Sequence, residues 1–144
     1  MLKEAPDHFD AELLLKIYDL RREQVMRESR YAIARDFWPR SAAEVLDVLR
    51  PDHPHNTAWR QVTGYWEMVY SMARNGVIHA EFLAENNGEG MFMFAKVEPY
   101  LADLRAAGNP ATLRNTEWIA SNTEAGKATL AYFRGRVAKA LAAK

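Results

Sequence analysis

Bulky apolar residues recur at helical spacing between residues 57 and 75, and this pattern fixes one element of the fold. One set occupies the first and fourth positions of a heptad: Trp59, Val62, Trp66, Val69 and Ala73. A second apolar stripe runs beside it, formed by Tyr65, Met68 and Met72. A helix that is apolar over so wide a face must be covered on more than one side. We therefore predict a central helix near residues 57–75, with the other helices packed around it.

The rest of the chain also has a helical pattern. Val and Ile are scattered singly, and the alternation that marks strands is nearly missing. With 144 residues, 49% of them hydrophobic, the chain is long enough to bury a core of its own. We predict an all-α fold of six to seven helices packed as an irregular bundle, with residues 1–144 forming a single helical domain.

The N-terminal part predicts one long helix over about residues 8–37. Asp7 can cap it, and Asp10 lies in the first turn, where negative charge is favourable. Glu23 stands four residues before Arg27, a spacing that supports a continuous, solvated helix. Pro39 ends this helix, because proline cannot continue it.

A helical core is predicted over about residues 41–143. Two capping boxes mark helix starts within it, Ser41 with Glu44 and Ser121 with Glu124. The second box opens the last helix. One face of that helix is apolar and consists of Leu130, Phe133, Val137 and Leu141.

Three further signals lie between these boxes. His79 is expected to open a short helix that ends near Asn86. A helix over about 89–107 contains Pro99, which predicts a kink near Glu98. Asn109 is then expected to cap the following helix, which runs through Ala120.

The glycine-containing stretch Glu85–Phe94 allows three interpretations: a calcium loop, a phosphate loop or a connector. A calcium loop would place Lys96 at the position of its bidentate glutamate, and the two glutamates would repel a phosphate. We interpret the stretch as a connector in which Asn and Gly supply positive φ. Met91, Phe92 and Phe94 then begin the next buried face.

Composition excludes several classes of site. The chain has no cysteine, which removes disulfides, thiolate zinc sites and iron–sulfur clusters. The 19 basic and 19 acidic residues cancel, so net charge gives no support for nucleic-acid binding. The N-terminus lacks a secretory pattern and no apolar run is long enough for a membrane span. We expect a bacterial-type cytoplasmic protein.

The loop "DHPHN" places Asp52, His53 and His55 close together, at a spacing that a transition metal could use. No fourth ligand is evident, and Asp and Asn beside proline are ordinary loop and cap residues. A capped helix entry is the alternative interpretation. The motifs of zincins, di-iron proteins, serine hydrolases and P-loops are missing. The sequence favours a protein with no enzymatic activity, no catalytic residues and no cofactor.

The last helix is basic, with Lys127, Arg134, Arg136, Lys139 and Lys144 after its only acidic residue. These cations could contact a phosphate backbone. They also suit the C-terminal end of a helix dipole and avoid the apolar face, as on any solvated helix. Nucleic-acid binding is therefore the third function that the sequence allows.

The aromatic and methionine residues of the central helix are the best candidates for a pocket or an interface. The candidates are Trp59, Tyr65, Trp66, Met68, Tyr70 and Met72. Such residues usually pack into a core, but they can also line an apolar cavity or a partner groove. The excess of apolar faces favours self-association.

Residues 59–120 resemble a family of uncharacterised bacterial helical domains, a domain of unknown function with members on or near membranes. The likeness rests on a helix that ends in "NG" at Asn75–Gly76, the short acidic helix after it, a helix that reaches Pro99, and "EWIA" at Glu117–Ala120. Some members carry an N-terminal membrane span, which this chain does not match. The resemblance implies a helical fold and brings no assigned activity and no catalytic residues.

From these observations we predict a helical interaction or regulatory module that forms a homodimer or another homo-oligomer, with a further, unidentified protein partner. The alternative is a small apolar ligand-binding protein or an enzyme, with its pocket beside the central helix.

Overall fold

A computed structural model describes residues 1–144, and every regular element in it is a helix. The helices are α1 (His8–Arg21), α2 (Gln24–Asp36), α3 (Ala42–Asp47), α4 (Asn56–Arg74), α5 (Ala80–Asn86), α6 (Glu89–Val97), the 3₁₀ turn η1 (Glu98–Tyr100), α7 (Leu101–Ala107), α8 (Arg114–Asn122) and α9 (Glu124–Ala142). The all-α prediction is confirmed. There are nine α-helices instead of six or seven because two of the long helices expected from the sequence are each divided.

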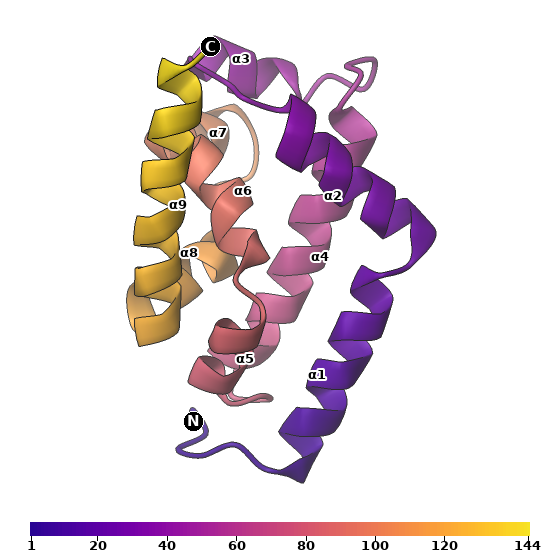
Figure 1. The fold of residues 1–144 in the computed structure, drawn as a ribbon, viewed down its shortest axis with the longest axis vertical. Coiled ribbons are helices and arrows are strands. Elements are labelled where there is room, and N and C mark those ends of the chain that lie inside the picture. Colours follow the sequence, from indigo (N-terminus) through magenta and orange to yellow (C-terminus); the bar gives the residue numbers. More distant parts are fainter.

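Helix α4 lies in the middle of the molecule, as its sequence pattern predicts (Figure 1). It packs against α2 and α8, while α9 packs against α6 and α8. All five residues of its heptad pattern are buried, and Trp66, Val69 and Tyr70 have no exposed surface. The burial of these large side chains is the main contribution of α4 to the stability of the bundle.

The N-terminal segment differs from the single helix predicted over about residues 8–37. Helix α1 ends at Arg21, and the Glu23 side chain accepts a hydrogen bond from the backbone N–H of Met26 (3.0 Å), which caps a new helix. The bend between α1 and α2 turns Ile17 and Met26 into the core, where both are buried. A straight helix would direct part of this apolar surface into water.

Two predicted caps are present in the first half of the chain. Asp7 accepts from the Asp10 backbone N–H (3.1 Å) and Asp10 accepts from that of Asp7 (2.9 Å), which makes a reciprocal capping box. Ser41 accepts from the Glu44 N–H (3.2 Å) and caps α3. The Glu44 carboxylate reaches back to the N–H of Arg40 (2.7 Å) and not to that of Ser41.

The helix expected over about 89–107 is interrupted, not just kinked. It is present as α6, η1 and α7. Pro99 lies inside η1, at a position where its missing N–H and its fixed φ prevent the α-helical hydrogen bond from continuing. The interruption falls where the sequence predicts the kink.

The start of α8 is set by α4, so the predicted cap at Asn109 is wrong. Helix α8 begins at Arg114. The Glu67 carboxylate of α4 accepts hydrogen bonds from the backbone N–H groups of Asn115 (3.1 Å) and Thr116 (2.8 Å). These contacts satisfy donors that an isolated helix would leave free. Asn109 forms a turn before the helix instead.

The predicted capping box of Ser121 with Glu124 is also wrong. Helix α8 continues through these positions to Asn122, and Thr123 caps α9 by accepting from the N–H of Gly126 (2.9 Å). The Glu81 carboxylate of α5 accepts from the backbone N–H of Glu124 (2.5 Å). As in α8, a carboxylate from another helix accepts from backbone N–H groups of the first turn, which have no partner within the helix.

The apolar face predicted for the last helix is confirmed. Leu130 and Val137 of α9 are buried, and Phe133 and Leu141 are half-buried against the core. The Phe133 ring stacks on Phe92 of α6, with ring centroids 4.9 Å apart.

Within residues 85–94, Asn87 and Gly88 form the connector that we predict. His79 opens α5 by accepting from the N–H of Phe82 (3.1 Å), and only two residues separate α5 from α6. Met91, Phe92 and Phe94 are buried at the start of α6.

The predicted reason for the glycines of residues 85–94 is wrong. Positive φ occurs only at Leu113 and Gly76, and neither lies in the connector. Gly90 is required by packing instead, because a Cβ atom there would overlap the Tyr70 hydroxyl. That hydroxyl donates to the carbonyl of Asn87 (2.7 Å).

Candidate interaction groove

Helix α4 has one side that the bundle does not cover. Its exposed residues recur every three or four positions and form what we call the open stripe, which consists of Thr57, Arg60, Gln61, Gly64 and Met68. The opposite side of the helix carries the buried tryptophans. The open stripe is therefore the part of the central helix that is most accessible to a partner.

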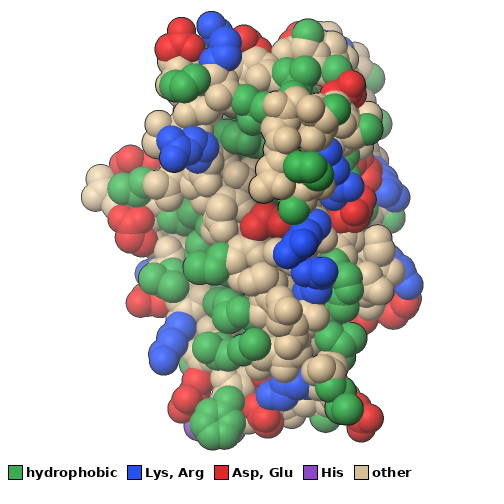
Figure 2. Space-filling model, turned by 180° about the vertical axis from the view of Figure 1, so that it is seen from behind, with side chains coloured by type: hydrophobic (Ala, Val, Ile, Leu, Met, Phe, Trp, Pro, Cys, Tyr) green, Lys and Arg blue, Asp and Glu red, His purple; other side chains and the backbone are tan.

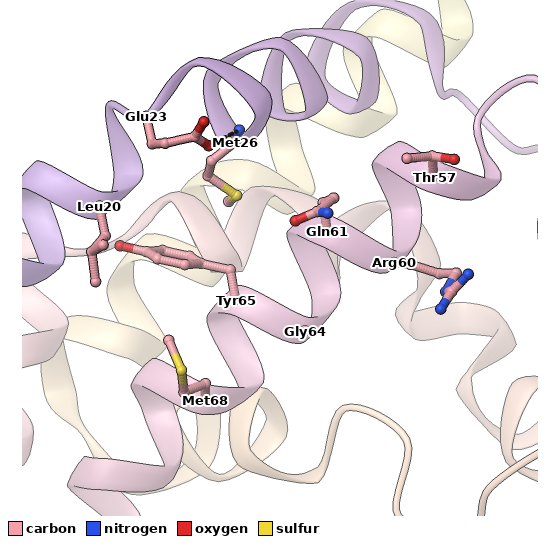
Figure 3. Close-up of a pocket in the computed structure, with 9 residues that line it drawn as sticks. All are labelled: Leu20, Glu23, Met26, Thr57, Arg60, Gln61, Gly64, Tyr65 and Met68. Atoms are coloured by element: carbon pink, nitrogen blue, oxygen red, sulfur yellow. Dashed lines mark hydrogen bonds between the residues drawn. The ribbon is translucent and has the colours of Figure 1, made fainter.

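A groove of about 550 Å³ runs between the open stripe and the joint of α1 and α2. We call it the α1–α4 groove. Its lining residues are Leu20, Glu23, Met26, Thr57, Arg60, Gln61, Gly64, Tyr65 and Met68 (Figure 3). In the close-up, Leu20, Met26, Tyr65 and Met68 form an apolar half, while Arg60 lies at the other end and points away from it. The groove thus combines an apolar wall with a charged end.

The polar atoms of the apolar half are already engaged. The Tyr65 hydroxyl donates to the carbonyl of Ile17 (2.5 Å), and burial raises the pKa of Tyr65 to about 12. Backbone N–H groups of Val25 and Met26 lower the pKa of Glu23, which is therefore ionised at neutral pH. The phenol is held as a structural donor, and Glu23 offers a fixed negative charge.

Arg60 differs from the other charged groups around the groove. It forms no hydrogen bond and no salt bridge within the chain, whereas the nearby Arg21 and Arg30 both contact Glu89. Glu23 accepts from a backbone N–H and forms no salt bridge within 4 Å, although the charge of Arg27, four residues on, acts on it. The groove thus carries one cation without a salt bridge and one anion, Glu23, that could meet a cation of a partner.

A second hollow, of about 340 Å³, lies on the other side of the open stripe. We call it the α4–α8 hollow. Its lining residues are Leu49, Trp59, Thr63, Gly64, Glu67, Asn109, Ala111, Thr112 and Leu113. Gly64 lines both the groove and the hollow. A Cβ atom added at Gly64 would meet nothing within 4 Å, so the backbone is bare between the two depressions.

Large apolar side chains are exposed on α1 and α4, and two of them, Leu20 and Met68, line the α1–α4 groove. On α1 the exposed fractions are 70% for Phe9, 66% for Leu15 and 54% for Leu20, and on α4 the value for Met68 is 51%. Figure 2, which shows the molecule from behind, has hydrophobic side chains gathered along its left side, over α1 and α4. Exposed apolar side chains that gather into a patch mark a binding surface more often than an inert one.

The six pocket or interface candidates from the sequence are divided between the core and the surface. Tyr65 and Met68 line the α1–α4 groove, and the buried Trp59 lines the α4–α8 hollow. Trp66 and Tyr70 have no exposed surface and stack on each other in the core, with ring centroids 5.4 Å apart. Met72 is partly buried against the core cluster.

Sequence reasoning did not identify Leu20, Arg60 or Gly64 as candidates. Gly64 could have been identified from the sequence, because a glycine inside a helix lowers the stability of that helix and its presence therefore needs another reason.

The histidine loop does not gather ligands. His53 accepts from the backbone N–H of His55 through Nδ1 (3.0 Å), and its Nε2 lies 3.6 Å from the Asp47 carboxylate. Asp52 points to solvent and approaches Arg50. No group of three or more His, Cys, Asp or Glu side chains is arranged to hold a metal ion. The loop instead joins α3 to α4.

The cations of α9 are partly neutralised within the chain. Lys127 pairs with Glu124 (2.9 Å), Arg134 pairs with Glu98, and the Arg136 guanidinium lies 5.0 Å from the centroid of the Phe92 ring. These contacts hold the side chains on the surface of their own helix.

A family model described as a domain of unknown function, DUF4760, matches residues 7–123. The chain belongs to this family. No curated protein and no solved structure matches the chain. The DUF4760 region begins at the cap of α1 and ends at the cap of α9. It therefore contains α1, α2, α4 and the whole α1–α4 groove, whereas the basic helix α9 lies beyond it.

A helix that spans a membrane must be both long and apolar. None of the protein's helices has both the length and the apolar character that crossing a bilayer requires.

Proposed function

We propose that this DUF4760 protein is a non-enzymatic interaction module that forms homo-oligomers through the surface of α1 and α4. The observation that carries the proposal is the exposed apolar surface made by Phe9, Leu15, Leu20 and Met68. In water this surface lowers the stability of the isolated chain, and covering it in an interface stabilises the assembly.

The chemistry of the α1–α4 groove supports binding more than catalysis. The Tyr65 hydroxyl is held by a backbone carbonyl, and the Glu23 carboxylate is held by a backbone N–H. Neither group is within hydrogen-bond distance of a second titratable side chain that could act with it as a base or an acid. The groove offers shape, apolar contact and charge.

The proposal is tested by measuring molar mass with light scattering over a wide range of protein concentration. We expect the wild-type protein to associate, and Leu20→Glu to weaken that association by roughly tenfold or more, because a carboxylate replaces a buried apolar contact. Tyr132→Glu is the matched control, since Tyr132 is also an exposed apolar residue but lies on α9 and lines neither depression. Equal effects of the two substitutions would contradict the proposal.

A second candidate function is the binding of a small apolar ligand in the α1–α4 groove. Its volume of about 550 Å³ is in the range of ligand sites, and its apolar half is formed by Leu20, Met26, Tyr65 and Met68. A fluorescent fatty acid is a suitable probe, because its chain fits the apolar half and its carboxylate can meet Arg60. Saturable binding that Met68→Glu removes and Tyr132→Glu leaves unchanged would favour this candidate.

A further inference from the structure

Gly64 has no explanation within its own chain. It lies in the interior of a 19-residue helix, where glycine costs about 1 kcal/mol relative to alanine. Two other helical glycines are required by close packing, because a Cβ at Gly90 would overlap Tyr70 and one at Gly126 would overlap the backbone of Ile119, whereas Gly135 of α9 is as open as Gly64. At Gly64 nothing lies within 4 Å, and φ is not positive. The exposed backbone at Gly64 is therefore accessible to a partner molecule.

The surface around Gly64 has the shape of a site where a second helix could cross α4. The α1–α4 groove lies on one side of it and the α4–α8 hollow on the other, so the surface falls away in both directions across the helix. A glycine at such a point lets the backbone of a second helix approach closely, with the flanking depressions receiving its side chains.

The charges of the groove are suited to a second copy of the same surface. Arg60 and Glu23 both line the groove; Arg60 forms no salt bridge within the chain, and Glu23 forms none within 4 Å, although the charge of Arg27 acts on it. An interface with two-fold symmetry uses one patch twice, so a residue pair that is complementary across the axis is satisfied in both directions. A surface that carries one cation and one anion meets this requirement, whereas a partner of a single sign would be repelled by one of them.

We propose that a second copy of this chain docks on the open stripe, with the two α4 helices antiparallel and the two-fold axis passing beside Gly64. This inference rests on the proposed function and names its partner and its geometry. The axis places Arg60 of one copy beside Met68 of the other, because these positions lie four residues on either side of Gly64. Arg60 thereby enters the other copy's groove, where Glu23 is available to it.

The decisive variant is Gly64→Gln, with Gly135→Gln as its control. Gly135 is also an exposed glycine inside a 19-residue helix with nothing within 4 Å of an added Cβ atom, but it lines neither depression. Both substitutions replace glycine with a good helix former, so both are expected to raise the stability of the monomer by about 1 kcal/mol. Thermal unfolding of each variant then shows that the fold is intact.

Sedimentation velocity measures the dimer dissociation constant of each protein. Gly64→Gln is expected to raise this constant by about a hundredfold or more, because its side chain occupies the point of closest approach, whereas Gly135→Gln leaves it unchanged. Arg60→Glu is expected to raise it by about tenfold or more, since it sets two carboxylates against each other at both ends of the interface.

The outcomes separate this inference from the proposed function. A dimer that Gly64→Gln leaves intact but Leu20→Glu weakens would overturn the crossing at Gly64 while the proposed function stands. A wild-type chain that remains monomeric at every concentration would overturn both. If a single monomer binds the fluorescent fatty acid and Gly64→Gln has no effect on mass, the groove serves a ligand and this inference is wrong.

Discussion

Lys96 is the only buried lysine or arginine of the protein. Its ammonium group donates to the carbonyls of Ile33 (2.7 Å), Ala34 (3.0 Å) and Phe37 (2.8 Å) at the C-terminal end of α2. It also lies 3.7 Å from the centroid of the Trp38 ring. Carbonyls that α2 leaves without an internal partner are thus satisfied by a side chain from α6.

The stability of the protein should depend on pH through Lys96. Burial, and then the nearby charges of Arg136 and Lys144, lower the pKa of Lys96 from 10.5 to about 7. Between these values the unfolded chain binds the proton and the native chain does not, so stability rises as pH increases above 7. The gain from pH 7 to pH 9 is at most about 2.7 kcal/mol, at about 1.36 kcal/mol for each pH unit.

Urea denaturation at a series of pH values measures this dependence. Lys96→Met removes the titrating group, so its stability should change less between pH 7 and pH 9 than that of the wild type. Parallel curves for the two proteins would show that the ammonium remains charged in the folded state over this range.

Gly90 is a residue whose size is fixed by a neighbour. A Cβ atom at this position would overlap the hydroxyl of Tyr70 and force the ring or α6 to move. We expect Gly90→Ala to destabilise the protein by about 1–3 kcal/mol, as overpacking of a core does. Gly135→Ala should stabilise it by up to about 1 kcal/mol, since that site is open. Chemical denaturation measures the free energy of unfolding of both variants. Changes of the same sign in the two variants would contradict this prediction.

At the scale of the elements, two helices depend on carboxylates from elsewhere in the chain. Glu67 of α4 accepts from the first turn of α8, including the Thr116 hydroxyl (2.7 Å), and Glu81 of α5 accepts from the first turn of α9. These charge-assisted hydrogen bonds fix where each helix begins and hold it against its neighbour.

Glu67→Gln should therefore cost about 1–3 kcal/mol of stability, because an amide cannot accept from every donor that the carboxylate satisfies. Glu124→Gln is the control: Glu124 is exposed and pairs only with Lys127, so its loss should cost less than about 0.5 kcal/mol. Urea denaturation measures both. A cost for Glu67→Gln as small as that of the control would mean that α8 does not depend on this cap.

The elements that could be predicted from the sequence are those whose signals are local. The period of apolar residues in α4 fixed its length and its buried face, and Asp7, Ser41 and His79 cap helices as their types predict. The start of α8 could not be predicted, because its cap comes from Glu67, far away in the chain. The start of α9 has a local cap at Thr123, to which Glu81 adds a distant acceptor, and the prediction placed the cap at Ser121 instead. Charge spacing likewise indicated one N-terminal helix, whereas Glu23 ends one helix and begins another.

The candidate groove could be predicted only in part for the same reason. Tyr65 and Met68 belong to the apolar stripes of α4 and were identified from their spacing. Leu20 and Arg60 become part of a groove only because the bend between α1 and α2 brings Leu20 beside α4. No pattern local to either residue carries that information.

At the scale of the whole molecule, one core joins the two ends of the chain. Its 29 buried residues extend from Ile17 in α1 to Val137 in α9, and α9 packs on α5, α6 and α8. We propose that residues 1–144 unfold as one cooperative domain. Thermal unfolding followed by tryptophan fluorescence and by far-ultraviolet circular dichroism should then give coincident transitions. Two separate midpoints would contradict a single domain.

The proposed self-association through α4 would explain together the exposed apolar surface, the bare backbone at Gly64 and the absence of a salt bridge at Arg60. Sedimentation equilibrium of the wild-type protein is the most direct test, because it gives mass without reference to shape. We expect the mass to rise with concentration from that of one 16.5 kDa chain to that of two. A mass that stays at one chain over the whole range would contradict the account.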